Sequence, residues 1–371
     1  MRVRRTDGRT VHLSYCTNVH PAEDLPGIIG QLDTYAVPVR ERLDAGVLGL
    51  GLWLAAPVAA ALADDGEARR LLRRELDARG LEVVTLNGFP YEAFQAPVVK
   101  HAVYQPDWTT EARLGYTLDL ARILVDLLPA DADRGSVSTL PLAWREPWRP
   151  AQRDAARHML DRLAEGLAEI AWQTGRVVRV AFEPEPGCVA ETTAQAVDML
   201  AGADTDRLGV CLDLAHLACA WEDPAEAVQR LATAGIPIVK VQVSAALEVA
   251  DPVAARPVLE QYAEPRFLHQ TRSAAGHACD DLDLALAENP PGPWRIHFHV
   301  PLHAPPAPPL TATTPLLREA LAVADCDHFD VETYTWDVLP AGQRPTSPAG
   351  LADGIAGELA WTRDQLTGGA V

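Results

Sequence analysis

Short apolar runs alternate along the chain with longer segments in which apolar residues recur every three or four positions. The short runs are 11–17, 48–54, 81–87, 136–140, 177–183, 208–213, 236–243, 295–300 and 329–333, and the longer segments are 34–46, 66–79, 110–127, 150–174, 189–202, 223–234, 314–323 and 348–367. Runs of the first kind predict strands and segments of the second kind predict helices. Near-continuous apolar strands that alternate with helices are typical of a parallel sheet buried on both faces, so we expect an α/β protein.

Nine predicted strands compete for the eight places of a (β/α)8 TIM barrel. We expect 295–300 to be the additional strand, because it lies in a segment, 245–310, that is too rich in proline and charge for an ordinary βα unit. We interpret this segment as an insertion after the seventh strand, a loop or hairpin over the carboxyl-terminal face of one single domain, 1–371. A proline-rich tract, 303–315, ends it, and Thr311 or Thr313 could cap the next helix. A doubly wound open sheet is the competing fold, but its glycine-rich turn after the first strand is missing.

Polar side chains gather where the predicted strands end, and this rim forms the active site of a TIM barrel. The rim residues, in chain order, are Asn18, His20, Trp53, Asn87, Tyr91, Thr139, Trp144, Glu183, Glu185, Asp213, His216, Gln242, Ser244, His297, His299, Glu332 and Tyr334. Because residues i and i+2 of a strand share a face, three pairs point the same way: Glu183 with Glu185, Gln242 with Ser244, and His297 with His299.

Acidic residues close the fifth, sixth and eighth predicted barrel strands, which are otherwise apolar. These are Glu183, Asp213 and Glu332, and Gln242 ends the seventh strand between them. Carboxylates are costly to bury without a partner or a metal. Together with one or two histidines they would form a mixed oxygen and nitrogen shell, which suits Mn, Mg, Co, Fe or Zn. We therefore predict a divalent-metal site.

Each of these residues also has a simpler explanation when it is taken alone. Asp213 could cap a helix that begins near Leu214, Glu185 could face solvent, and His297 and His299 could be ordinary strand histidines. Four independent caps at neighbouring strand ends explain the pattern less well than one common site does. Other chemistries have weaker signals, since the GxSxG motif of serine hydrolases is missing and Cys16 is expected to be a buried thiol.

Composition excludes several classes of protein. Apolar residues make up 48% and charged residues 22%, the balance of a globular protein. Lys and Arg number 32 and Asp and Glu number 51, a net charge of −19, which disfavours nucleic acid and anionic lipid as partners. Six scattered cysteines without a CxxC pair indicate a reducing compartment. The basic N-terminus has no apolar core of a signal peptide, and the apolar stretch 48–63 is too short to span a bilayer. We expect a cytoplasmic protein without membrane insertion.

Four motifs give this sequence a family resemblance. FEPEPG (182–187), LDLAH (212–216), KVQVS (240–244) and VETYTW (331–336) stand in the order and spacing of the xylose isomerase-like, or sugar phosphate isomerase/epimerase-like, TIM barrels. Within that superfamily, HLSYCTNVHPAEDL (12–25), LNGFPY (86–91), RIHFHVPLH (295–303) and VETYTWDVLP (331–340) resemble the EboE family of metabolite-traffic proteins, from the bacterial Ebo gene cluster. The likeness runs from residue 12 to about 365. It implies a role in processing or trafficking a metabolite precursor, with other Ebo-cluster proteins as partners.

The resemblance also implies roles for individual residues. Glu183, Asp213 and Glu332 take the places of metal ligands, and His216 takes that of a histidine that contacts substrate or a second metal. Gln242 stands where the superfamily has a third, histidine ligand. The HFH segment is similar to a metal-binding DxH segment of the endonuclease branch, so His299 is expected to restore that imidazole. Glu185 stands where xylose isomerases carry a catalytic lysine.

Three functional hypotheses follow. The first is a divalent-metal-dependent isomerase or epimerase of a small polyhydroxylated or cyclic metabolite, with Glu183, Glu332 and His216 as catalytic groups. The substrate contacts expected for it are Asn18, His20, Trp53, Asn87, Tyr91, Glu185, Ser244, His297, Tyr334 and Trp336. The second is a non-catalytic metabolite-binding protein that keeps an old active-site pocket. The third is a metal-dependent phosphoesterase of endonuclease type, disfavoured because Trp53 and Asn87 stand where that branch has further histidines.

Overall fold

The computed structural model describes residues 1–369, in which eight parallel strands close into a barrel. The barrel order is β2 (Thr10–Cys16), β3 (Leu48–Trp53), β4 (Leu81–Asn87), β5 (Gly135–Thr139), β6 (Val178–Phe182), β7 (Leu208–Asp213), β8 (Ile238–Val243) and β14 (His328–Val331), which pairs again with β2. A short strand, β1 (Arg2–Arg4), adds antiparallel to β2. The predicted TIM barrel is confirmed, because every predicted barrel strand takes its place in chain order.

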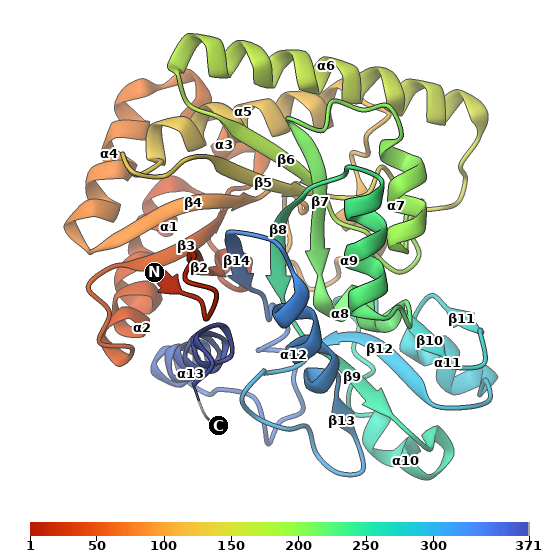
Figure 1. Ribbon diagram of the computed structural model, residues 1–371. Helices are drawn as coiled ribbons and strands as arrows, with labels where there is room; N and C mark the ends of the chain where they lie inside the picture. The colour runs from red at the N-terminus through yellow and green to blue at the C-terminus, as the bar shows by residue number, and fades with distance from the viewer. Residues whose placement is uncertain (370–371) are drawn as a thin grey trace.

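Helices surround this barrel (Figure 1). They are α1 (Leu25–Gln31), α2 (Val37–Arg42), α3 (Ala56–Asp64), α4 (Gly66–Ala78), α5 (Glu111–Leu127), α6 (Pro150–Thr174), α7 (Thr193–Leu200), α8 (Leu214–Cys219), α9 (Pro224–Thr233), α12 (Thr314–Val323) and α13 (Pro348–Thr367). The longest, α6, starts with Pro150 at its first position and ends at Gly175, whose φ of 68° is a left-handed conformation that favours glycine. Helix α3 was not predicted, because its alanines continue the apolar run of β3 without a change of period.

An ion pair fills the barrel interior below the strand ends. Lys240 and Asp330 are fully buried, and the Lys240 Nζ lies 2.8 Å from the Asp330 Oδ2. The Ser14 hydroxyl donates a hydrogen bond of 2.7 Å to the other carboxylate oxygen. Gly51 makes room for this pair, since a Cβ there would overlap the Asp330 carboxylate. Lys240 and Asp330 precede Gln242 and Glu332 by two residues, so they form the layer beneath them.

The insertion after β8 builds a second, antiparallel sheet of its own. Its order is β11 (Ala278–Cys279), β10 (Thr271–Ser273), β12 (Trp294–His299), β9 (Ala246–Val249) and β13 (Thr311–Ala312), accompanied by α10 (Pro252–Leu259) and α11 (Leu282–Glu288). The ninth predicted strand is therefore β12, outside the barrel as expected. The segment forms more than the expected loop or hairpin, because five strands pair in this sheet. The arrows of β7 and β8 point toward this sheet (Figure 1), and α8 packs against β12, so the insertion lies at the carboxyl ends of the barrel strands.

Thr313 stands at the start of α12 without capping it. Its hydroxyl accepts a hydrogen bond of 2.9 Å from the Ala246 backbone N–H, which ties the helix start to β9. The expected threonine cap is thus replaced by a link between the insertion and the last βα unit.

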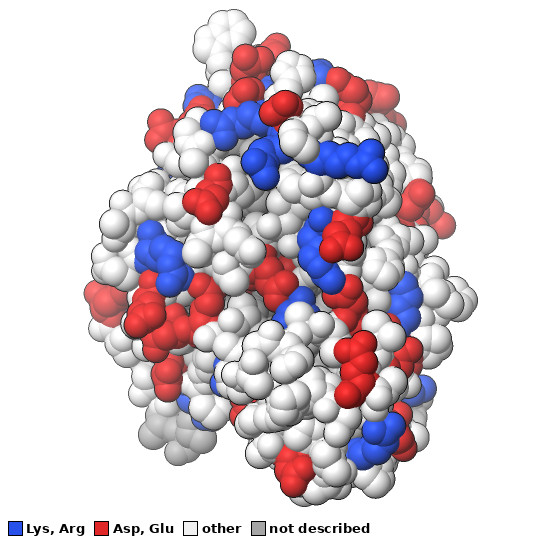
Figure 2. Space-filling model, turned by 90° about the vertical axis from the view of Figure 1, so that its right-hand side faces the viewer, with Lys and Arg blue, Asp and Glu red and all other residues white. Residues whose placement is uncertain are grey.

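Two further features concern the distribution of charged side chains on the surface and the apolar character of the helices. In the face shown in Figure 2, acidic and basic side chains are interspersed rather than gathered in a patch of one sign. Among residues 1–369, no helix combines the length and the apolar character that a membrane crossing requires.

Candidate metal centre

The ends of β6, β7 and β14 bring the three predicted acids together. Glu183, Asp213 and Glu332 are 3%, 1% and 5% exposed. Potential ligand atoms of Glu183, Asp213 and His216 all lie within 4.8 Å of one another, and so do those of Asp213, His299 and Glu332. Asp213 belongs to both groups, so the two sets overlap in one cluster at the carboxyl end of the barrel.

Several donor atoms in this cluster are buried and bare. In the described part of the chain, the Glu183 Oε2, the Asp213 Oδ2, the His299 Nε2 and both polar atoms of the Gln242 amide have no hydrogen-bond partner. Buried polar atoms nearly always have one, because desolvation without compensation is costly. Gln242 pairs with Asp213 in the register of β7 and β8, so its amide belongs to the same end of the barrel. Carboxylate, amide and imidazole donors together fit a divalent cation such as Mn, Mg, Co, Fe or Zn.

Two of these candidate ligands are held in orientations that leave one atom without a hydrogen-bond partner among the described residues. The Asp213 Oδ1 accepts hydrogen bonds of 2.8 Å from the Ser244 hydroxyl and from the His216 backbone N–H. Asp213 therefore caps α8, the helix cap considered in the sequence, and its Oδ2 is still available to a cation. The His299 Nδ1 lies 2.8 Å from the Glu332 carbonyl oxygen, which places the proton on Nδ1 and a lone pair on Nε2. This arrangement is typical of a metal-binding histidine.

Two asparagines hold Glu332. The Asn18 and Asn87 side-chain amides donate hydrogen bonds of 2.8 and 2.9 Å to the Glu332 Oε1. The Asn87 Oδ1 in turn accepts from the Phe89 backbone N–H at 2.9 Å, which fixes the direction of its amide. The carboxylate plane of Glu332 is thereby set by residues that end β4 and follow β2.

The cluster concentrates negative charge that has no nearby cation of its own. Burial and the neighbouring carboxylates Glu332 and Asp213 raise the pKa of Glu183 well above its usual value. Burial, with Asp213 next, also raises the pKa of Glu332. Within residues 1–369, no lysine or arginine forms a salt bridge with any of the three acids, and Lys240 beneath them is engaged with Asp330. A bound cation is the simplest way to balance this charge.

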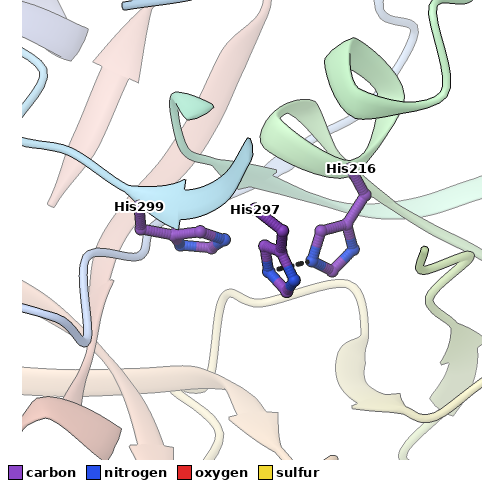
Figure 3. Close-up of side chains that lie close together, drawn as sticks. All are labelled: His216, His297 and His299. Carbon is purple, nitrogen blue, oxygen red and sulfur yellow. Dashed lines mark hydrogen bonds between the residues drawn. The ribbon is translucent and has the colours of Figure 1, made fainter. Parts of the chain in front are cut away.

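Three imidazoles adjoin the acids: His216 from α8, and His297 and His299 from β12 (Figure 3). Each Nδ1 faces a carbonyl or amide oxygen, at 3.0 Å for His216 on Pro184, 2.7 Å for His297 on Gln270 and 2.8 Å for His299. The Nε2 atoms of His216 and His297 lie 2.9 Å apart. Burial lowers the pKa of His216 to about 4, so it is neutral at pH 7. Neutral imidazoles with protonated Nδ1 atoms turn their Nε2 lone pairs toward one another, an arrangement that a shared proton or cation would stabilise.

A pocket lined by Glu183, Glu332 and His216, among others, opens onto this cluster. A family model described as "Xylose isomerase-like TIM barrel" matches residues 40–259, which is more than half of the chain. The chain belongs to the xylose isomerase-like TIM barrel family. The matched range contains Glu183, Asp213 and Gln242, whereas His299 and Glu332 lie beyond it.

Solved structures of this fold include several enzymes. A xylose isomerase-like TIM barrel protein from Mycobacterium smegmatis in complex with magnesium is 15% identical, with 96% of this chain and 98% of that chain covered and a TM-score of 0.53. The D-allulose 3-epimerase from Methylomonas sp. is 12% identical, with 96% and 97% covered and a TM-score of 0.51. The probable 3-DHS dehydratase AsbF from Bacillus anthracis is 13% identical, with 95% and 98% covered and a TM-score of 0.50. At these identities the likeness shows the fold. No curated protein matches the sequence.

In this member of the xylose isomerase-like family, Glu183 and Glu332 line the pocket together with six other side chains that were predicted to contact substrate or act in catalysis. These are Asn18, Asn87, Glu185, His216, His297 and Tyr334. Glu185 is not solvent-facing: it is 4% exposed, its Oε1 accepts a hydrogen bond of 2.8 Å from the Tyr104 hydroxyl, and burial raises its pKa to about 8.

Seven further predicted residues lie outside this pocket lining, and so do the candidate ligands Asp213, Gln242 and His299. His20 stacks on Tyr35 with ring centroids 4.1 Å apart, and the Trp53 indole donates to the Pro90 carbonyl, so both serve the packing between β2, β3 and the neighbouring loops. Tyr91 packs edge-on to Tyr116, and Trp336 borders a separate surface hollow. The other three are Ser244, which bonds Asp213, Thr139, which accepts from the Trp108 indole, and Trp144, which packs against Tyr104.

Tyr104, which lines the pocket, and Gln270, which contacts Tyr104, have no signal in the sequence pattern. Tyr104 lies in a 3-10 turn, η3 (Lys100–Tyr104), of the long loop after β4, and Gln270 lies just before β10 in the insertion. The Gln270 amide donates to the Tyr104 hydroxyl and to the Pro186 carbonyl, both at 2.9 Å. Neither residue follows a barrel strand, so only the tertiary fold of the loop and the insertion brings them here.

Proposed function

We propose that the protein is a divalent-metal-dependent isomerase or epimerase of a small polyhydroxylated or cyclic metabolite. The observation that carries this proposal is the set of buried donor atoms without partners among residues 1–369, next to a pocket that Glu183 and Glu332 line. Glu183, Asp213, Glu332 and His299 would hold the cation, with the Gln242 amide oxygen as a weaker donor. A divalent cation, when bound, lowers the pKa of a C–H next to a carbonyl by drawing electron density from the carbonyl oxygen.

Glu183 and Glu332 are the candidates that take and return the proton. They end β6 and β14, and both line the pocket. Asn18 and Asn87 orient Glu332 by holding its Oε1. His216 is neutral at pH 7, so we assign it the task of orienting a substrate hydroxyl.

Deuterium exchange tests this function across a whole class of substrates at once. The purified protein, loaded with Mn²⁺, would be incubated in D₂O with a panel of ketoses and cyclic hydroxy-ketones, and ¹H NMR would follow the loss of the signal of the proton next to the carbonyl. We expect exchange that needs the metal and that falls at least about 100-fold in Glu183→Gln and in Glu332→Gln, as for lost general acid–base groups. Exchange by the wild type that survives in both variants would overturn the assignment.

The EboE-like strings support the further proposal that this reaction serves the processing or traffic of a metabolite precursor, with other proteins of the Ebo cluster as partners. Gln242 and Glu185, which stand in place of a histidine and a lysine, are the features that favour a carrier without chemistry. A carrier would keep its biological activity in Glu183→Gln and lose it when a bulky side chain fills the pocket. The isomerase loses it in both variants.

The three imidazoles favour one second candidate, a metal-dependent phosphoesterase. His216, His297 and His299 offer ligand nitrogens within 4.8 Å of one another, beside the acids, where a second cation would fit. Phosphoester hydrolysis commonly uses two cations about 3.5–4 Å apart. Metal analysis distinguishes the candidates, because one tightly bound ion per chain supports the isomerase and two support the phosphoesterase.

A further inference from the structure

The pocket lining has two chemically different parts. One part is the acidic cluster with its histidines. The other part contains Phe94 from the loop after β4, Phe267 from the insertion before β10, and Tyr334 after β14. Their ring centroids lie 5.2 Å apart for Phe94 and Phe267, 5.3 Å for Phe94 and Tyr334, and 4.8 Å for Phe267 and Tyr334. We call these three rings the aromatic wall.

All three residues of the aromatic wall lie in segments outside the barrel strands. Its three members come from segments far apart in the chain, and Leu268 and Val103 extend the apolar lining beside them. An apolar surface that borders an open pocket gains free energy when an apolar ligand covers it. Aromatic rings in particular favour the flat faces of other rings.

Free cations are missing from the lining that residues 1–369 provide. Lys100 is the single lysine or arginine of this lining, and its ammonium group pairs with the Asp281 carboxylate and lies 3.4 Å from the Glu264 carbonyl oxygen. The Arg113 guanidinium, behind the loop after β4, donates hydrogen bonds to the carbonyl oxygens of Gly88 and Phe89. Phosphate and carboxylate groups are normally bound by free arginine or lysine. Here they would instead face the Glu183, Glu185 and Glu332 side chains.

We propose that the substrate is an uncharged molecule with two unlike ends. Its hydroxylated end, a vicinal diol or hydroxy-ketone, faces the acidic cluster, and its aromatic or aliphatic ring lies against the aromatic wall. Sugar phosphates and sugar acids are expected to bind less well, because the lining, within the described residues, offers no free lysine or arginine to pair with their charged group. This inference rests on the proposed function for the position of the hydroxylated end, whereas the aromatic wall and the missing cation stand independently of any chemistry.

Three small probes test this inference: 1-phenyl-1,2-ethanediol, glycerol and glycerol 3-phosphate. Their binding to the full-length protein would be measured by isothermal titration with and without saturating Mg²⁺. We expect the phenyl diol to bind at least about tenfold more tightly than glycerol, because a phenyl ring leaves water, and glycerol 3-phosphate to bind most weakly. Phe94→Ala is expected to remove most of the phenyl advantage, whereas Trp172→Ala, at a largely exposed tryptophan on α6, leaves it unchanged.

Tighter binding of glycerol 3-phosphate, or a phenyl diol that gains nothing over glycerol or fails to bind, overturns the inference. Should Phe94→Ala fail to fold, the ranking of the three probes on the wild type decides the question by itself. The outcome is separable from that of the proposed function. A preference for the phenyl diol without metal binding or deuterium exchange would contradict only the proposed isomerase function. Metal binding and exchange together with a preference for glycerol 3-phosphate would contradict only the proposed substrate class.

Discussion

Single residues around Asp213 show how this protein would prepare a metal ligand. The Ser244 hydroxyl donates to the Asp213 Oδ1 and accepts from the Ala215 backbone N–H at 3.0 Å, so it couples the carboxylate to the start of α8. Removing such a support usually costs about 10- to 100-fold in metal affinity. We expect Ser244→Ala to weaken Mn²⁺ binding about tenfold, measured by isothermal titration.

Ser136 supplies the matched control, because it is also a buried serine of a barrel strand. Its hydroxyl bonds Thr85 and His328 in the barrel interior instead of a predicted ligand. Ser136→Ala is expected to leave the Mn²⁺ affinity unchanged. Equal losses in the two variants would mean that the effect comes from the barrel and not from Asp213.

His299 is the residue that supplies nitrogen to the predicted shell. Its bare Nε2 lies 3.9 Å from the Asp213 Oδ2, whereas Gln242 offers only amide atoms. Imidazole favours Zn and Co over Mg, which prefers oxygen. His299→Ala should therefore weaken Co²⁺ binding much more than Mg²⁺ binding, as followed by competition titration. His158→Ala, on the exposed side of α6, is the control, and an equal loss for both metals would argue against a direct bond.

At the scale of elements, the barrel layer formed by Lys240 and Asp330 supports the strand ends above it. Asp330→Ala leaves the Lys240 ammonium buried without its partner, which we expect to lower the free energy of unfolding by about 3–5 kcal/mol in denaturant titrations. The double variant Lys240→Met with Asp330→Leu removes both charges and is expected to recover most of that loss. Asp77→Ala breaks an exposed pair with Arg73 on α4 and should cost nothing measurable. A single variant as stable as the wild type would show that the pair contributes little.

Elements also show how far sequence reasoning reaches. Alternating periods predicted each barrel strand, and the cost of burying charge predicted that Glu183, Asp213 and Glu332 share a site. Helix α3 and the second sheet were not predicted, because an alanine-rich helix continues the period of the strand before it and because short insertion strands carry little alternation. Trp53 and His20 were expected at the pocket, yet strand register and loop packing turn them to neighbouring contacts that no single-strand pattern encodes.

At the scale of the whole molecule, the buried carboxyls link stability to pH. Above about pH 7, unfolded glutamates are ionised. In the metal-free folded protein, burial raises the pKa of Glu185 to about 8 and raises that of Glu183 well above its usual value, so the folded state binds more protons. The free energy of unfolding then falls as pH rises, by at most about 1.4 kcal/mol per pH unit for each such carboxyl. Buried histidines with lowered pKa values, such as His216 and His297, oppose this only close to pH 7, because their unfolded imidazoles are about one quarter protonated there and have lost nearly all of that proton by about pH 8.

Thermal unfolding between about pH 7 and pH 8.5 checks this prediction. We expect the Tm of the metal-free protein to fall with rising pH and to fall less in Glu185→Gln, which keeps a hydrogen-bond acceptor for Tyr104 without titrating. Saturating Mg²⁺ should stabilise the protein more at the higher pH, because the cation competes with protons for the same oxygens. A Tm that rises across this range in the metal-free protein contradicts the account.

The most direct test of the central claim is a crystal structure of the protein soaked with Mn²⁺ and measured at a wavelength where manganese scatters anomalously. The account predicts one strong anomalous peak at the carboxyl end of the barrel, within bonding distance of carboxylate oxygens of Glu183, Asp213 and Glu332 and of the His299 Nε2. A map without a peak there, or with the cation bound elsewhere while these side chains stay bare, would contradict it.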